Sequence, residues 1–155
     1  MKLSVHDTLI GNVGIAEHEG CITNLFFAKD KLPAGIERIE TEELKEAFLQ
    51  LDRYLAGNLK AFSLPLAPAG TPFMQGVWRI LSQIPYGATV SYRDVAVALG
   101  NPLASRAVGM ANHRNPLPVF IPCHRVIGSD GNLAGYRGGQ ALKKLLLELE
   151  RSWVS

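Results

Sequence analysis

Residues 58–70 divide this chain, because they contain two prolines, end on a glycine and show no clear periodicity. A stretch of this kind favours a connector over a helix or a strand. A chain of 155 residues is long enough for one domain, or for two small ones that share an interface. We therefore expect an N-terminal domain over residues 1–64, a connector at 65–71 and a C-terminal domain over residues 72–155.

The first part reads as strands followed by a helix. Short segments at residues 3–6, 13–18 and 21–27 are separated by glycine-containing turns, which is typical of an antiparallel meander. Thr41 then precedes two glutamates and is a good N-cap, and Gly57 is a good C-terminal stop. Between them, apolar residues recur at helical spacing at Leu44, Phe48, Leu51 and Leu55. This pattern predicts a small α+β domain.

The second part is mainly helical. A helix is expected over residues 72–84, with proline at its first position and an apolar face. Ser91 and Asp94 resemble a capping box and predict the start of a second helix, which ends at Gly100. After an Asn-Pro turn, a third helix is expected over residues 103–114. Two helices joined by so short a turn resemble a helix-turn-helix motif.

The remainder of the second part is predicted to be an extended segment, a turn and a closing helix. The extended segment covers residues 119–127, and Ser-Asp-Gly-Asn at 129–132 is a strong turn signal. Residues 133–136 could form a short returning strand, or wing. The closing helix, over residues 139–150, is expected to bury Leu142, Leu145, Leu146 and Leu149.

The charge is unevenly distributed along the chain. The net charge is +2, but residues 1–70 carry a net of −3 and residues 71–155 a net of +5. The basic part is rich in arginine, which favours an anionic partner such as nucleic acid, although an ordinary solvated surface explains +5 equally well.

The composition excludes several other classes. No apolar run approaches the roughly 20 residues that a membrane span needs, and the N-terminus lacks the features of a secretory signal. Two cysteines a hundred residues apart form neither a disulfide framework nor a zinc ribbon, so a reducing, cytoplasmic setting is expected. His6, His18 and Cys21 have no convincing fourth partner, so we expect no metal.

Residues 121–126, Ile-Pro-Cys-His-Arg-Val, place a nucleophile, a base and a cation together. A lone cysteine is often only a small buried hydrophobe, but Pro122 interrupts a strand here and two charged or polar residues follow Cys123. In a flat strand Cys123 and His124 would point to opposite faces, so we expect a bridging water to join them. A third group should then orient the imidazole, and Glu150 and Glu148 are both candidates.

The hexapeptide resembles the active-site signature of the O6-alkylguanine-DNA alkyltransferases, also called methylated-DNA–protein-cysteine methyltransferases. The resemblance is strong over residues 71–151 and weaker over residues 1–70, where only the order of strands and helix fits. It implies a ribonuclease H-like N-terminal domain and a winged helix-turn-helix C-terminal domain. Further motifs in the family's order are Val-Ser-Tyr at 90–92, Gly-Asn-Pro at 100–102, Ser-Arg-Ala-Val-Gly at 105–109, Asn-Pro at 115–116 and Gly-Tyr-Arg-Gly-Gly at 135–139.

The resemblance also implies a mechanism. Cys123 would accept the alkyl group from O6-alkylguanine irreversibly and once per molecule, and O4-alkylthymine is left open as a second substrate. His124 would take the thiol proton through a water, Glu150 would hold the imidazole, and Tyr92 would assist departure of the guanine. Other residues implied are Asn115 as structural support, Arg106, Ala107, Gly109, Arg114 and Arg125 as DNA contacts, and Val126, Tyr136 and Arg137 as the substrate pocket.

The partner implied is double-stranded DNA containing an alkylated guanine, which is flipped out of the duplex and approached through the minor groove. We expect a monomer without a cofactor and without membrane association, located in the cytoplasm, or in the nucleus of a eukaryote. Two alternatives remain open: a non-catalytic binder of alkylated DNA, disfavoured because Cys123 is present, and a cysteine hydrolase with a Cys–His–Glu triad. The hydrolase is disfavoured because no oxyanion-hole motif is evident.

Overall fold

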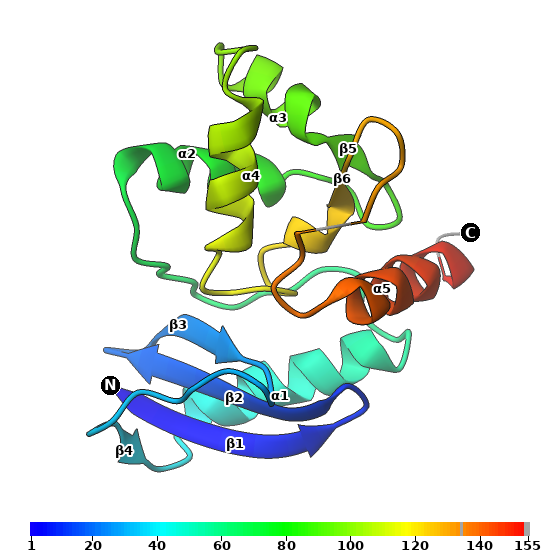
Figure 1. Ribbon diagram of the computed structural model, residues 1–155. Helices are drawn as coiled ribbons and strands as arrows, with labels where there is room; N and C mark the ends of the chain where they lie inside the picture. The colour runs from blue at the N-terminus through cyan, green and yellow to red at the C-terminus, as the bar shows by residue number, and fades with distance from the viewer. Residues whose placement is uncertain (134, 154–155) are drawn as a thin grey trace. The chain divides into compact units, whose positions relative to one another are not determined.

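The computed structural model describes residues 1–133 and 135–153, and the chain divides into two units, Met1–Ala69 and Gly70–Ser155 (Figure 1). The first unit contains a sheet and a helix, and the second is mainly helical, which confirms the predicted α+β class. In the described part of the chain, no helix is both long and apolar enough to cross a membrane.

The N-terminal unit is built on a four-stranded sheet in the order β3-β2-β1-β4 (Figure 1). Strands β1 (Lys2–Thr8), β2 (Gly11–His18) and β3 (Cys21–Phe26) form the predicted antiparallel meander. Strand β4 (Glu37–Arg38) pairs in parallel with β1 and was not predicted, because two residues are too few to show an alternating pattern.

Helix α1 (Glu42–Leu55) packs against β1, β2 and β3. As predicted, Thr41 caps it: its hydroxyl accepts a hydrogen bond from the backbone N–H of Leu44. The predicted apolar stripe is buried. Residues 65–67, at the expected connector, lie beside β3, where Ile22 bonds through its backbone to Pro65 and Ala67.

The C-terminal unit begins with three helices whose starts the sequence predicted. Helix α2 (Pro72–Leu81) is capped by the Thr71 hydroxyl and has proline in its first turn. Helix α3 (Tyr92–Ala98) begins with the complete Ser91–Asp94 capping box, in which both reciprocal bonds are present. Helix α4 (Ser105–His113) packs on both α2 and α3.

The segment after α4 is not the extended strand that we expected over residues 119–127. Val119 has a positive φ of 76°, residues Cys123–Arg125 form a 3-10 turn, and only β6 (Val126–Ile127) is extended. Strand β6 pairs in parallel with β5 (Val90–Ser91). Pro122 explains the break, since a proline cannot donate to a sheet.

The predicted wing and the predicted face of the last helix also differ from the structure. Leu133, Gly135 and Tyr136 are not in a strand, and Ala134 lies outside the described residues. Helix α5 (Gln140–Ser152) forms as expected, but Leu145 is exposed and the buried positions are Lys143, Leu146, Leu147 and Glu150. The buried stripe is therefore shifted and includes two charged residues.

Candidate active site

Cys123 opens the 3-10 turn and is almost completely buried, with 3% of its surface exposed. Its backbone N–H donates to Ile121, and the Val126 N–H donates to its carbonyl oxygen. These two bonds fold the chain back on itself at the cysteine. The other cysteine, Cys21, is half-buried in the N-terminal unit.

Burial raises the pKa of the Cys123 thiol. A hydrogen bond from the Asn115 side chain and the positive charges of Lys143 and Arg137 act in the opposite direction, but they do not outweigh burial. Cationic neighbours alone would have suggested a reactive thiolate. The resting site instead holds a protonated thiol, so its reaction requires a base.

His124 and Glu150 form a buried pair beside Cys123. The imidazole Nε2 lies 2.7 Å from Glu150 Oε2, and neither side chain is exposed. Because a carboxylate can only accept, Nε2 carries the hydrogen, and Nδ1 is the basic nitrogen of the ring. Burial lowers the pKa of His124 despite the opposing effect of Glu150, so the imidazole is neutral and able to take a proton.

Arg125 is not an exposed DNA contact, which corrects the role we expected for it. Its side chain is buried, with Nε donating to Glu150 Oε1 at 2.8 Å and Nη2 donating to Oε2 at 2.9 Å. Nη1 donates to the Ile84 carbonyl at 2.7 Å. A guanidinium held by two planar bonds to a buried carboxylate has no surface to offer a phosphate. Arg125 fixes Glu150, and the Gly87 N–H also donates to that carboxylate.

Lys143 is a buried cation near the site that the sequence reasoning missed. Its Nζ donates to the Val126 carbonyl at 2.6 Å and lies 6.0 Å from the centre of the Tyr92 ring. Burial lowers the pKa of Lys143, and the charge of Cys123 opposes this shift. The signal available in the sequence was its spacing from Glu150, since residues 143, 146, 147 and 150 lie on one face of a helix.

Two asparagines connect the end of α4 to the turn that carries Cys123. Asn115 donates from Nδ2 to the Ile121 carbonyl and accepts at Oδ1 from the Leu117 N–H, both at 2.9 Å. Asn112, which the sequence reasoning did not select, donates from Nδ2 to the Cys123 carbonyl at 3.3 Å.

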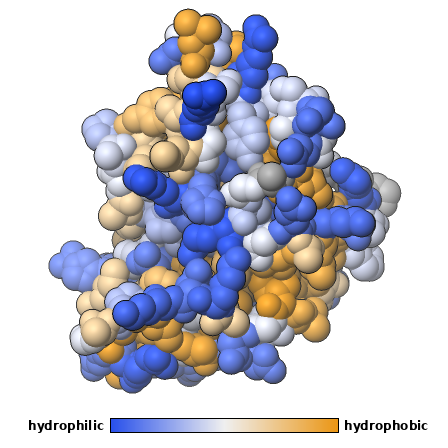
Figure 2. All heavy atoms as spheres, in the orientation of Figure 1, coloured by the Kyte–Doolittle hydropathy of each residue, from blue (hydrophilic) through white to orange (hydrophobic). Residues whose placement is uncertain are grey.

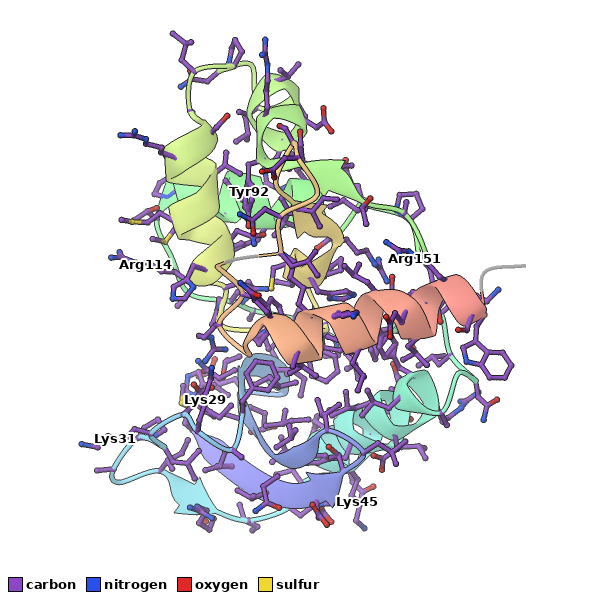
Figure 3. The ribbon with its side chains drawn as sticks, turned by 45° about the vertical axis from the view of Figure 1, so that its right-hand side comes forward. Lys29, Lys31, Lys45, Tyr92, Arg114 and Arg151 are labelled. Atoms are coloured by element: carbon purple, nitrogen blue, oxygen red, sulfur yellow. The ribbon has the colours of Figure 1, made fainter. Side chains whose placement is uncertain are left out.

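Tyr92 and Tyr136 lie near the thiol. The charge of Cys123 contributes to raising the pKa of both hydroxyls, although burial is the larger cause for each. Figure 3 shows Tyr92 between α4 and β6, and its ring and hydroxyl lie close to Gly109 and Gly135 respectively. Two protonated phenols beside a thiol can donate hydrogen bonds to a bound base.

The outer face of α4 combines basic and apolar side chains. Arg106, Ala107, Met110 and Arg114 are all exposed and follow the i, i+3, i+4 spacing of one helix face. Arg114 points away from the body of the unit in Figure 3. Figure 2 shows hydrophobic atoms at the tip of the α3–α4 turn, where Leu103 is 95% exposed. Such a surface suits an elongated anionic partner with apolar edges.

Gly109, in contrast, does not belong to this outer face. It is half-buried, and a side chain built there would first meet the Tyr92 ring, at 3.8 Å. The helix pair α3 and α4, the basic outer face of α4 and the buried Cys123 together define a helix-turn-helix protein with a buried cysteine as its candidate nucleophile.

The chain belongs to the 6-O-methylguanine DNA methyltransferase family. The family's ribonuclease-like domain matches residues 1–68, and its DNA binding domain matches residues 72–152. The constitutive methylated-DNA–protein-cysteine methyltransferase of Bacillus subtilis is 49% identical over 152 residues, which cover 94% of this chain and 92% of that protein. The methylated-DNA–protein-cysteine methyltransferase of Methanosarcina barkeri is 45% identical, with 98% of both chains covered.

Solved structures agree with this assignment. The Mycobacterium tuberculosis protein OGT, in its crystal structure in complex with DNA, superposes with a TM-score of 0.93 at 41% identity, covering 99% of this chain and 94% of its own. The O6-methylguanine-DNA methyltransferase of Pyrococcus kodakaraensis superposes with a TM-score of 0.74 at 29% identity, covering 96% and 98%.

Proposed function

We propose that this protein repairs DNA by transferring the alkyl group from O6-alkylguanine irreversibly to Cys123. It is a methylated-DNA–protein-cysteine methyltransferase that acts once. The observation that carries the proposal is the position of Cys123 beside the buried His124–Glu150 pair, in the same unit as the helix-turn-helix.

The reaction begins with removal of the thiol proton. Because the pKa of Cys123 is raised and that of His124 is lowered, the resting pair is a neutral thiol and a neutral imidazole. His124 Nδ1 takes the proton through a bridging water, while Nε2–H stays bonded to Glu150. Glu150 stabilises the imidazolium that forms, and Arg125 holds Glu150 in place.

The sulfur then displaces guanine from the alkyl carbon. A carbon–sulfur bond forms, the carbon–O6 bond breaks with its electrons moving to the base, and the proton removed from Cys123 neutralises the guanine. Tyr92 keeps its proton because its pKa is raised, so its hydroxyl assists the leaving base as a hydrogen-bond donor. The product is a thioether, which has no carbonyl for water to attack, so the protein is not regenerated.

The target base must leave the helix to reach a buried thiol. We propose that the outer face of α4 enters the minor groove, with Arg106 filling the gap left by the flipped nucleotide. Ala107 keeps the outer face of the helix slim, Arg114 contacts phosphate, and Val126, Tyr136 and Arg137 line the pocket. Binding is then mainly to the backbone and depends on salt. A protein that acts on one base needs no second copy, so we expect a monomer, working in the cytoplasm or, in a eukaryote, the nucleus.

The decisive experiment mixes the protein with a duplex that carries O6-methylguanine labelled in the methyl group. Label should move to the protein, at most one per molecule, and mass analysis should place it on Cys123. Cys123→Ala should abolish transfer and retain DNA binding, and Cys21→Ala is the matched control that should transfer normally. Label released as a free small molecule over many turnovers would refute the single-use mechanism.

A further inference from the structure

Asn112 lies on the inner face of α4, where it is a polar residue among apolar side chains. Only 2% of its surface is exposed, and Val108 and Ala111 of the same helix are buried with it. The opposite face of this short helix carries Arg106 and Met110, which are exposed. Asn112 therefore sits behind the surface that we propose for DNA and cannot contact DNA itself.

The amide of Asn112 reaches the peptide group of the nucleophile. Its Nδ2 donates to the Cys123 carbonyl at 3.3 Å. The same carbonyl already accepts from the Val126 N–H within the 3-10 turn, so Asn112 is not needed to satisfy it. What the bond adds is a direct connection between α4 and the residue that carries Sγ.

The amide oxygen of Asn112 indicates that a contribution to stability does not explain why an asparagine lies here. Asn112 Oδ1 is buried and has no hydrogen-bond partner within residues 1–133 and 135–153. A buried acceptor without a partner destabilises a fold, whereas an apolar side chain of similar shape would be neutral or favourable. The position thus carries a residue that weakens packing, and its donor contacts the active site.

We propose that Asn112 is a positioning residue that ties the Cys123 turn to the recognition helix, so that docking of α4 on DNA fixes the direction from which Sγ approaches the alkyl carbon. This inference rests on the proposed function. Cys123 depends on this placement because Sγ must align with the carbon–O6 bond, and a misplacement of about 1 Å can slow a reaction on the order of 100-fold.

Asn112→Leu separates positioning from stability. The variant removes the donor to Cys123 and the unsatisfied acceptor together, and the Cys123 carbonyl keeps its bond from Val126. We expect alkyl transfer from a saturating duplex to slow at least about tenfold, because the near-attack geometry is lost. The dissociation constant for DNA should change less than about twofold, since a buried side chain makes no phosphate contact. The melting temperature should stay at or above that of wild type.

Val108→Ala, a buried substitution in the same helix, is the control for a loss of stability, and Asn112→Ala is a second test of the missing donor. Val108→Ala should melt lower and still transfer at the wild-type rate. The inference is overturned if both Asn112 variants transfer like wild type, or if Val108→Ala loses as much rate as they do. Failure of the proposed function gives a different result, since wild type itself would then take no label from the duplex.

Discussion

Replacing Arg125 with methionine should destabilise the C-terminal unit and leave DNA affinity close to wild type. Arg125 lies in the basic part of the sequence, directly after the candidate nucleophile and base, and its position in the sequence predicts a contact with DNA. The structure instead gives it three donor bonds, two to Glu150 and one to the Ile84 carbonyl, at 2.7–2.9 Å. Its side chain is 9% exposed and that of Glu150 is 1% exposed.

The magnitude follows from the carboxylate that is left behind. Removing one partner of a buried ion pair costs about 3–5 kcal/mol, because the remaining charge stays buried and loses its compensation. In a domain of this size each kcal/mol lowers the melting temperature by roughly 4–8 °C, so a fall of at least about 12 °C is expected. Adding Glu150→Met to Arg125→Met removes the stranded charge, so the double variant should be more stable than the sum of the two single losses predicts.

The assay is urea unfolding of each variant beside a salt titration of DNA binding. Arg114→Met is the matched control, because Arg114 is an exposed arginine on the outer face of α4. It should change the free energy of unfolding by less than about 0.5 kcal/mol. It should also weaken DNA binding and lower the salt slope by about one. If Arg125→Met unfolds like wild type and binds DNA more weakly, the structural role of Arg125 is wrong.

Three further predictions concern the pH dependence, the buried lysine and the arginine finger. The pKa of His124 is lowered in the folded state, so the unfolded chain takes up a proton on His124 near the ordinary imidazole pKa of about 6.5 while the folded chain does not. The free energy of unfolding should therefore fall as the pH drops through that value. A free energy of unfolding that is the same at pH 7 and pH 5 would contradict a buried neutral imidazole. Lys143→Met should raise the pKa of Cys123 further, measured by the pH dependence of thiol alkylation, whereas Lys144→Met on the exposed side of α5 should not. Arg106→Ala should slow repair of duplex DNA more than reaction with the free alkylated base, and equal losses on the two substrates would refute its role in flipping.

Local signals predicted the parts of this fold that depend on neighbours in sequence. The start of α3 is one case, because Ser91 and Asp94 satisfy each other across three residues and need no partner from elsewhere. The caps of α1 and α2 and the strands of the meander are similar. The interruption at Pro122 was expected from the sequence, but the 3-10 turn at Cys123–Arg125 and the positive φ at Val119 were not, because hydrophobic periodicity reports neither.

The face of α5 shows a different limit. The stripe at residues 142, 145, 146 and 149 consists of four leucines, whereas the neighbouring stripe at 143, 146, 147 and 150 contains a lysine and a glutamate. Hydrophobic periodicity therefore selected the first stripe, which is the wrong one. The structure buries the stripe that contains Lys143 and Glu150, because each has partners: Val126 for the lysine, and His124 with Arg125 for the glutamate. Burial of a charge is decided by partners that are distant in sequence, so a single sequence does not reveal it.

The groups that donate to Glu150 connect the stability of this unit to its chemistry. Glu150 is tolerated in the core only while Arg125, His124 and the Gly87 N–H all donate to it. Because this fixed carboxylate accepts from Nε2, it also gives His124 a defined tautomer. A base prepared in this way must be neutral and buried, and burial in turn keeps the Cys123 thiol protonated until it is needed. A protein that can react only once gains from this arrangement, because an exposed thiolate would be consumed by other electrophiles before it met DNA.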